Sequence, residues 1–167
     1  MRPSDDFQEF YQAGYGRTVA MVAAITGSRH EAEDIAQEAY ARALARWPRL
    51  RGYDMPEAWV RRVALRLAID SGRRARRGQL VSARIAAQRQ PPGPEPGDDL
   101  RYTALGAALA DLPVRERIVV VLHYLADLPV DTIAIECRLP VSTVKSRLAS
   151  GRRHLEQHLT QHPEAVA

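Results

Sequence analysis

The sequence predicts an all-α protein in which a Pro/Gly-rich linker joins two small helical domains. Apolar residues recur at spacings of three and four along most of the chain, and no stretch of convincing length shows the alternation of a strand. Residues 91–97 hold four prolines and two glycines, a composition that cannot continue a helix. We therefore expect a first domain over residues 1–77, a linker over 78–99, a second domain over 100–160 and a tail over 161–167.

Three helices are expected in the first domain. The first covers residues 7–25 and is broken near Gly14 and Gly16. Ser28 and Glu31 have the spacing of a capping box, which predicts that a second helix begins after Ser28. The third begins at Pro56, a residue suited to a first helical turn, and runs to about residue 77.

The second of these helices has the clearest buried face. Its apolar side chains keep a 3/4 spacing over four turns and should form one stripe: Ala32, Ile35, Ala36, Ala39, Tyr40, Ala43, Leu44 and Trp47. The polar side chains between them should face outward: Asp34, Gln37, Glu38 and Arg42. On the third helix, at 100° per residue, Arg62, Arg66, Arg73 and Arg77 project within about 60° of one another.

Charge is distributed unevenly along the chain, although its formal net value is only +4. Residues 1–40 carry three arginines against seven acids, whereas residues 41–90 carry thirteen against three. An acidic first segment and a strongly basic middle indicate different partners, with polyanion binding localised to the middle.

In the second domain, helices are expected over residues 102–111 and 114–127, followed by a pair of short helices. The first member of the pair covers residues 131–137, residues 138–140 form the turn, and Ser142 is the expected N-cap of the second. Val144 and Leu148 would then point inward, leaving outer faces to Thr143, Lys145, Ser146 and Arg147. This is the layout of a DNA-binding helix-turn-helix; the alternative is an amphipathic helical hairpin that packs against another surface.

Several classes of protein are disfavoured. The single cysteine, Cys137, excludes an internal disulfide and fits a reducing cytosol. No apolar run approaches the roughly 20 residues needed to cross a bilayer, so we expect a cytoplasmic protein without membrane insertion. The five histidines form no metal-spaced set with acids, and no phosphate-binding loop or nucleophile elbow occurs, so we expect neither a cofactor nor enzymatic activity.

Four segments together resemble the bacterial RNA polymerase sigma factors of the extracytoplasmic-function type. They are His30-Glu-Ala-Glu-Asp-Ile-Ala-Gln-Glu38, Pro56-Glu-Ala-Trp-Val-Arg-Arg-Val-Ala64, Leu109-Ala-Asp-Leu-Pro113 and Thr143-Val-Lys-Ser-Arg-Leu148. The resemblance covers nearly all of residues 7–158 and implies sigma domain 2 before the linker and sigma domain 4 after it. Its implied function is to bind RNA polymerase core and start transcription at specific promoters, as an alternative sigma factor that answers a stress or signal.

The resemblance also implies roles for particular residues. Asp34, Gln37 and Glu38 correspond to the surface that contacts polymerase core. Residues 49–56 correspond to the loop that captures a flipped base of the minus-ten element, and Tyr53 is the ring available for stacking. The arginines of the third helix would bind minus-ten DNA, chiefly its phosphates: Arg61, Arg62, Arg66, Arg73, Arg74, Arg76 and Arg77. The minus-35 contacts would come from Ser142, Thr143, Lys145, Ser146, Arg147 and Arg152. An anti-sigma factor is a further implied partner, and the implied location is the nucleoid.

The chain departs from the family pattern at four places. Arg66 replaces a common Asn, Arg138 a turn Gly, Pro129 a capping Ser, and Ser150-Gly151 a frequent Arg-Ala pair. Two alternative functions remain open at this point. One is a helix-turn-helix regulator that acts without polymerase, and the other is a sigma-like decoy that binds a partner without reading a promoter.

Overall fold

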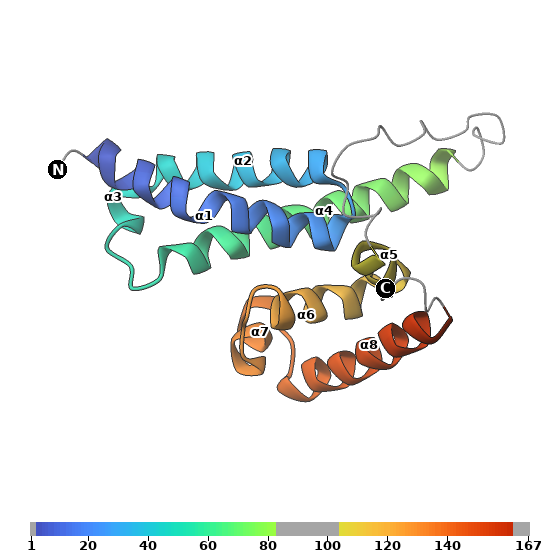
Figure 1. Cartoon of the computed structure of the whole chain (residues 1–167). Helices are drawn as coiled ribbons and strands as arrows, with labels where there is room; N and C mark the ends of the chain where they lie inside the picture. Colours follow the sequence, from blue (N-terminus) through green and yellow to red (C-terminus); the bar gives the residue numbers. More distant parts are fainter. Residues whose placement is uncertain (1–2, 83–103, 162–167) are drawn as a thin grey trace.

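The computed structural model describes residues 3–82 and 104–161, which form two helical units and contain no strand (Figure 1). The first unit consists of α1 (Pro3–Thr26), α2 (Arg29–Ala45), the short α3 (Trp47–Leu50) and α4 (Pro56–Ser82). The second consists of α5 (Ala104–Asp111), α6 (Val114–Tyr124), α7 (Val130–Cys137) and α8 (Val141–Gln161). The expected all-α class with a helix-turn-helix is confirmed.

Helix α2 is the central element of the first unit, packed against both α1 and α4. Its N-terminus forms as expected, because the Ser28 hydroxyl accepts a hydrogen bond from the Glu31 amide at 3.3 Å. The Glu31 carboxylate does not return to the cap, however; it accepts a hydrogen bond from Ser71 and so ties α2 to α4. Helix α1 continues through Gly14 and Gly16 without the expected break.

One end of this bundle is filled with aromatic rings. Phe7 and Phe10 pack on Trp47, with ring centroids 5.3 and 4.9 Å apart. Tyr11 stacks on Tyr15, whose ring lies 4.8 Å away. These rings come from α1 and from the start of α3, so they fix the direction in which the chain leaves α2.

The predicted buried stripe of α2 is right except at Leu44. The other seven members are buried, whereas Leu44 is 53 % exposed. The helical step puts Leu44 at the margin of the stripe, 100° beyond Ala43, where neither α1 nor α4 covers it.

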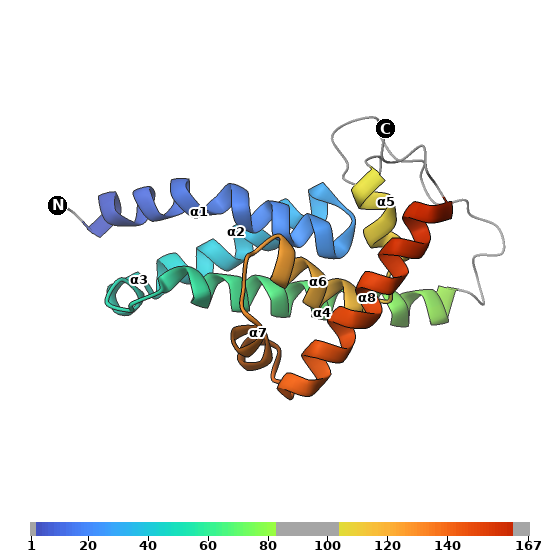
Figure 2. The same cartoon turned by 60° about the horizontal axis from the view of Figure 1, so that its bottom comes forward.

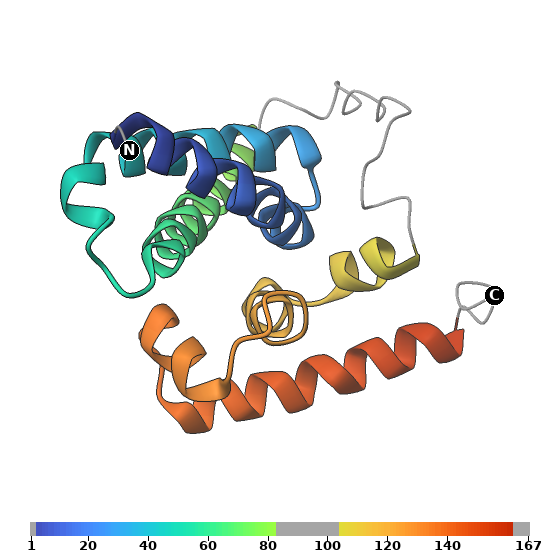
Figure 3. The same ribbon diagram turned by 60° about the vertical axis from the view of Figure 1, so that its left-hand side comes forward.

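Helix α4 runs through Ser82, five residues past the expected end of the first domain, and residues 83–103 lie outside the described part of the chain. In the second unit, α8 packs against α5, α6 and α7 (Figure 3). Figures 1 and 3 show α6 between α8 and the first unit, and in Figure 2 α8 crosses in front of α4. Among the described residues, no helix combines the length and apolar character that a membrane span requires.

Candidate polymerase and nucleic-acid interfaces

The acidic face of α2 is open to solvent. Asp34, Gln37 and Glu38 are all exposed, opposite the buried stripe. Asp34 and Glu38 line a shallow groove of about 410 Å³ that Arg74 of α4 borders. Glu38 also accepts a hydrogen bond from Arg42 Nε at 2.7 Å. This face can engage a basic partner helix without any loss of packing inside the bundle.

A second groove, of about 560 Å³, lies between α2 and α4. Four of its lining residues are arginines: Arg42, Arg46, Arg62 and Arg66. Trp59 lines the same groove, and the Arg46 guanidinium carbon lies 5.7 Å from the centroid of its ring. Cations beside an aromatic ring are what single-stranded nucleic acid requires, because phosphates need charge and unpaired bases need a stacking surface.

Our sequence interpretation included Arg62 and Arg66 but missed the contribution of α2. Arg42 lies in the last turn of α2 and Arg46 is its C-cap, four residues later, a spacing that was available in the sequence. Arg66, which stands where the family commonly has Asn, lies among these cations.

The Tyr53 ring stands apart from this groove. It lies in the loop between α3 and α4, is 54 % exposed and is not among the groove's lining residues. The Tyr53 amide donates to the Leu50 carbonyl at 3.0 Å, which fixes the backbone beneath an otherwise free ring. Met55 is exposed beside it.

The remaining arginines of α4 are exposed, as the predicted stripe requires, but they serve different surfaces. Arg73 and Arg76 line a cleft of about 620 Å³ between the two units, where Arg115, Arg117 and Arg147 of the second unit also lie. Arg74 instead borders the acidic groove of α2, and Arg77 is solvent-exposed. Arg61 does not belong to the exposed stripe, because it is paired with Glu136 of α7.

The helix-turn-helix consists of α7, a turn over residues 138–140, and α8. Arg138 ends α7 in the left-handed region, at φ 53° and ψ 50°, a conformation that favours Gly. The expected Ser142 N-cap is wrong. Helix α8 begins at Val141, and the Pro140 carbonyl accepts from the amides of residues 143 and 144, which places Ser142 inside the first turn.

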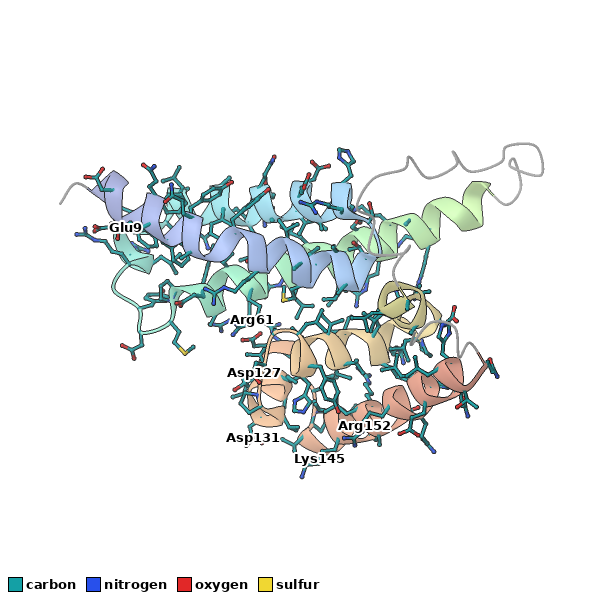
Figure 4. The ribbon with its side chains drawn as sticks, viewed as in Figure 1. Glu9, Arg61, Asp127, Asp131, Lys145 and Arg152 are labelled. Atoms are coloured by element: carbon teal, nitrogen blue, oxygen red, sulfur yellow. The ribbon has the colours of Figure 1, made fainter. Side chains whose placement is uncertain are left out.

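Most of the predicted minus-35 residues share the outer face of α8. Ser142, Lys145, Ser146 and Arg152 are exposed, and Thr143 is half-buried. Figure 4 shows Lys145 on the side of the second unit that points away from the first. Arg147 is the exception, since it lines the cleft toward α4.

A polar network clamps α8 to α6 and gives Ser150-Gly151 a structural role. Ser150 donates to the Glu116 carboxylate at 2.7 Å, and His154 Nδ1 lies 2.6 Å from its other oxygen. Burial would raise the pKa of Glu116, but these two hydrogen bonds and the nearby positive charges outweigh it and hold the pKa below its usual value. A Cβ on Gly151 would meet Val120 Cγ2 at 2.7 Å, so the two helices approach too closely for Ala.

The side chains of the described residues include no group of His, Cys, Asp and Glu able to hold a metal ion. Cys137 is a free thiol whose pKa burial and the Glu136 carboxylate raise to about 11. At neutral pH this thiol is neutral and a poor nucleophile or metal ligand.

Comparisons with known proteins agree with the division into two units. Residues 10–78 match the family model of Sigma-70 region 2, and residues 102–155 match that of Sigma-70, region 4. The chain is 32 % identical over 148 residues to the ECF RNA polymerase sigma factor SigW of Bacillus subtilis, an alignment covering 80 % of this chain and 78 % of that one. It is 31 % identical over 150 residues to the ECF RNA polymerase sigma factor SigE of Mycolicibacterium smegmatis, with 86 % of this chain and 57 % of the relative covered.

Two solved structures share the fold. One is the sigma factor RpoE in complex with the anti-sigma factor NepR from Bartonella quintana, with a TM-score of 0.72, 20 % identity and coverage of 93 % of this chain and 97 % of that one. The other is CnrH in complex with the cytosolic domain of CnrY, with a TM-score of 0.65, 18 % identity and coverage of 95 % and 90 %. Together with the order of the two matched regions, the sequence identities lead to one conclusion: this chain belongs to the family of ECF RNA polymerase sigma factors.

Proposed function

We propose that the chain binds RNA polymerase core through the acidic face of α2 and directs initiation at promoters that its two units read separately. The observation that carries the proposal is the separation of three surfaces: an acidic face on α2, an arginine groove beside it, and a helix-turn-helix in the second unit. Polymerase core would supply the chemistry, so the chain itself acts as a transcription initiation factor and not as an enzyme. We expect it to work in the cytoplasm, at the nucleoid.

The minus-ten element would be bound as an opened strand. The groove of Arg42, Arg46, Arg62 and Arg66 would hold its phosphates, with the neighbouring Trp59 as an aromatic surface. Tyr53, exposed on its loop, would stack on the base that leaves the duplex. Arg73, Arg74, Arg76 and Arg77 extend the basic surface along α4.

The minus-35 element would be read as duplex DNA. Ser142, Lys145, Ser146 and Arg152 lie on the exposed face of α8, whose N-terminal part enters the major groove in this motif. Thr143 and Arg147 border that face, and we expect them to join the contacts once the second unit is free of the first.

An anti-sigma factor is the expected regulatory partner. The two solved relatives were each determined as a sigma protein held by another chain, the anti-sigma factor NepR in one case and the cytosolic domain of CnrY in the other. An acidic α2 face and a basic cleft between the units would offer such a partner two surfaces of opposite charge.

Co-purification with polymerase core, followed by run-off transcription, tests the proposal. Wild-type chain should bind core and start transcripts, and Glu38→Arg should lose core binding while it keeps its helix content. Glu156→Arg, an equal charge reversal at an exposed site on α8, is the control and should bind core normally. A chain that binds duplex DNA but not core would be a simple regulator, and a chain that binds core without starting transcripts would be a decoy; either result refutes the proposal.

A further inference from the structure

The two units meet where α1 packs against α6 and α5, and one ion pair also joins α4 to α7. Arg61 of α4 grips the Glu136 carboxylate of α7 with both ends of its guanidinium: Nη2 lies 2.7 Å from Oε1, and Nε lies 3.1 Å from Oε2. The two side chains are only 16 % and 4 % exposed. Figure 4 shows Arg61 on the side of α4 that faces the second unit. Such a bidentate, poorly hydrated pair fixes orientation as well as distance.

A second arginine joins the units through backbone carbonyls. Arg117 of α6 donates to the carbonyl of Ile25, at the end of α1, at 3.0 Å. The same guanidinium donates to Ala110 and Leu112 in its own unit at 2.8 and 3.0 Å. The last carbonyls of a helix carry partial negative charge, so a cation is favourable there.

This closed arrangement has an electrostatic cost. The cleft between the units contains five arginines, Arg73, Arg76, Arg115, Arg117 and Arg147, against a single carboxylate, Glu31. Burial and the charge of Arg76 both lower the pKa of Arg117, as expected when two positive charges repel each other. Repulsion across the cleft therefore opposes closure, and the attraction between Arg61 and Glu136 offsets that repulsion.

The same cleft places DNA-binding candidates of both units opposite one another. Arg73 and Arg76 belong to the minus-ten surface, Arg147 belongs to the minus-35 surface, and all three line a space of about 620 Å³. A major groove about 12 Å wide admits a whole helix, so a duplex is far too large for this space. Closure therefore keeps a duplex from the cleft side of these three residues, while Arg73 and Arg76 keep part of their surface in solvent.

We propose that α1 and α4 together form a docking surface for the chain's own helix-turn-helix unit, that Arg61 and Glu136 hold the two units closed, and that promoter DNA competes with this closed state. The inference rests on the proposed function only for the identity of the nucleic acid. Only molecules in the open state can use all of their DNA contacts. The apparent dissociation constant for DNA is therefore the constant of the open state divided by the fraction of molecules that are open.

The closed state itself can be tested without DNA. Glu136→Arg brings two guanidiniums together, so small-angle scattering of the full chain should show a larger radius of gyration at unchanged helix content. The exchanged pair Arg61→Glu with Glu136→Arg should restore the wild-type radius. Asp131→Arg, a reversal at an exposed site of the same helix, is the control and should stay compact. An unchanged radius in Glu136→Arg, or an exchanged pair that stays expanded, overturns the proposal.

Competition with DNA is tested by a gentler pair of variants. Glu136→Gln and Asp131→Asn each remove one negative charge from α7, so their general electrostatic effects on DNA binding match. Only Glu136→Gln should open the chain, and it should bind promoter duplex roughly tenfold more tightly than Asp131→Asn, a change of about 1.4 kcal/mol. Equal affinities in an expanded Glu136→Gln protein would refute the competition. If the wild-type chain failed to bind core or to start transcripts, the proposed function would be refuted, and the scattering result would be unaffected.

Discussion

Replacement of Gly151 by Ala tests the closest helix approach in the second unit. The new Cβ would lie 2.7 Å from Val120 Cγ2 and 3.6 Å from Glu116 Cβ, and Val120 is 2 % exposed and cannot swing aside. Overpacking of this kind costs about 1–3 kcal/mol, whereas Gly to Ala inside a helix gains about 1 kcal/mol. We therefore expect a net loss of about 1 kcal/mol in the free energy of unfolding.

Gly16 provides the matched control, because a Cβ there meets nothing within 4 Å. Gly16→Ala should gain about 0.5–1 kcal/mol, so one chemical change has opposite signs at the two sites. Urea unfolding followed by circular dichroism measures both. The two tryptophans, Trp47 and Trp59, lie in the first unit, so their fluorescence reports which unit has changed. If Gly151→Ala proved as stabilising as Gly16→Ala, the helices would have room to separate and the packing argument would fail.

Three further predictions concern the turn, the polar clamp and the minus-ten loop. Arg138→Gly should raise the free energy of unfolding by about 1 kcal/mol in urea titrations, because Gly adopts φ 53° without strain, while Arg153→Gly in the middle of α8 should lower it by a similar amount; equal losses would mean that the left-handed turn is not strained. The lowered pKa of Glu116 adds stability that is present above the ordinary carboxyl pKa and is lost as pH falls through the folded-state pKa. Glu116→Gln should therefore be less stable than wild type at neutral pH, and in thermal melts its melting temperature should fall less steeply between pH 5 and 3. A parallel fall in the two proteins would contradict the contribution of Glu116. Tyr53→Ala should leave binding to paired promoter DNA nearly unchanged and reduce strand opening in permanganate footprints, and a preformed bubble should rescue it; equal losses on both templates would show that Tyr53 does not hold a flipped base.

Local chemistry in the sequence was enough to predict most helix positions. The Ser28 cap and the buried stripe of α2 follow from patterns within a few residues of one another, and both are confirmed apart from Leu44. The prediction of Ser142 as N-cap was wrong because the helix begins earlier than the hydroxyl suggested. The Pro140 carbonyl already accepts the first helical hydrogen bonds, so Ser142 lies inside the first turn.

Features that join distant segments could not be predicted in the same way. The resemblance placed Arg61 among the arginines that bind minus-ten DNA, but its partner Glu136 lies 75 positions away in another unit. Gly151 similarly departs from the family pattern, and its reason, the close approach of Val120, lies in another helix. Periodicity indicates which side of a helix is polar, and only the tertiary arrangement decides what that side meets.

The aromatic cluster at the end of the first bundle has a consequence for synthesis of the chain. Its rings all come from residues 7–47, and the bundle is complete once α4 has been made, so the first unit can fold before the helix-turn-helix leaves the ribosome. Glu136, the closing partner of Arg61, is translated more than fifty residues after α4 ends. Until then the nascent chain presents a finished acidic face on α2 and an uncovered α4, and polymerase or an anti-sigma factor that arrives at this stage meets no competition from the second unit.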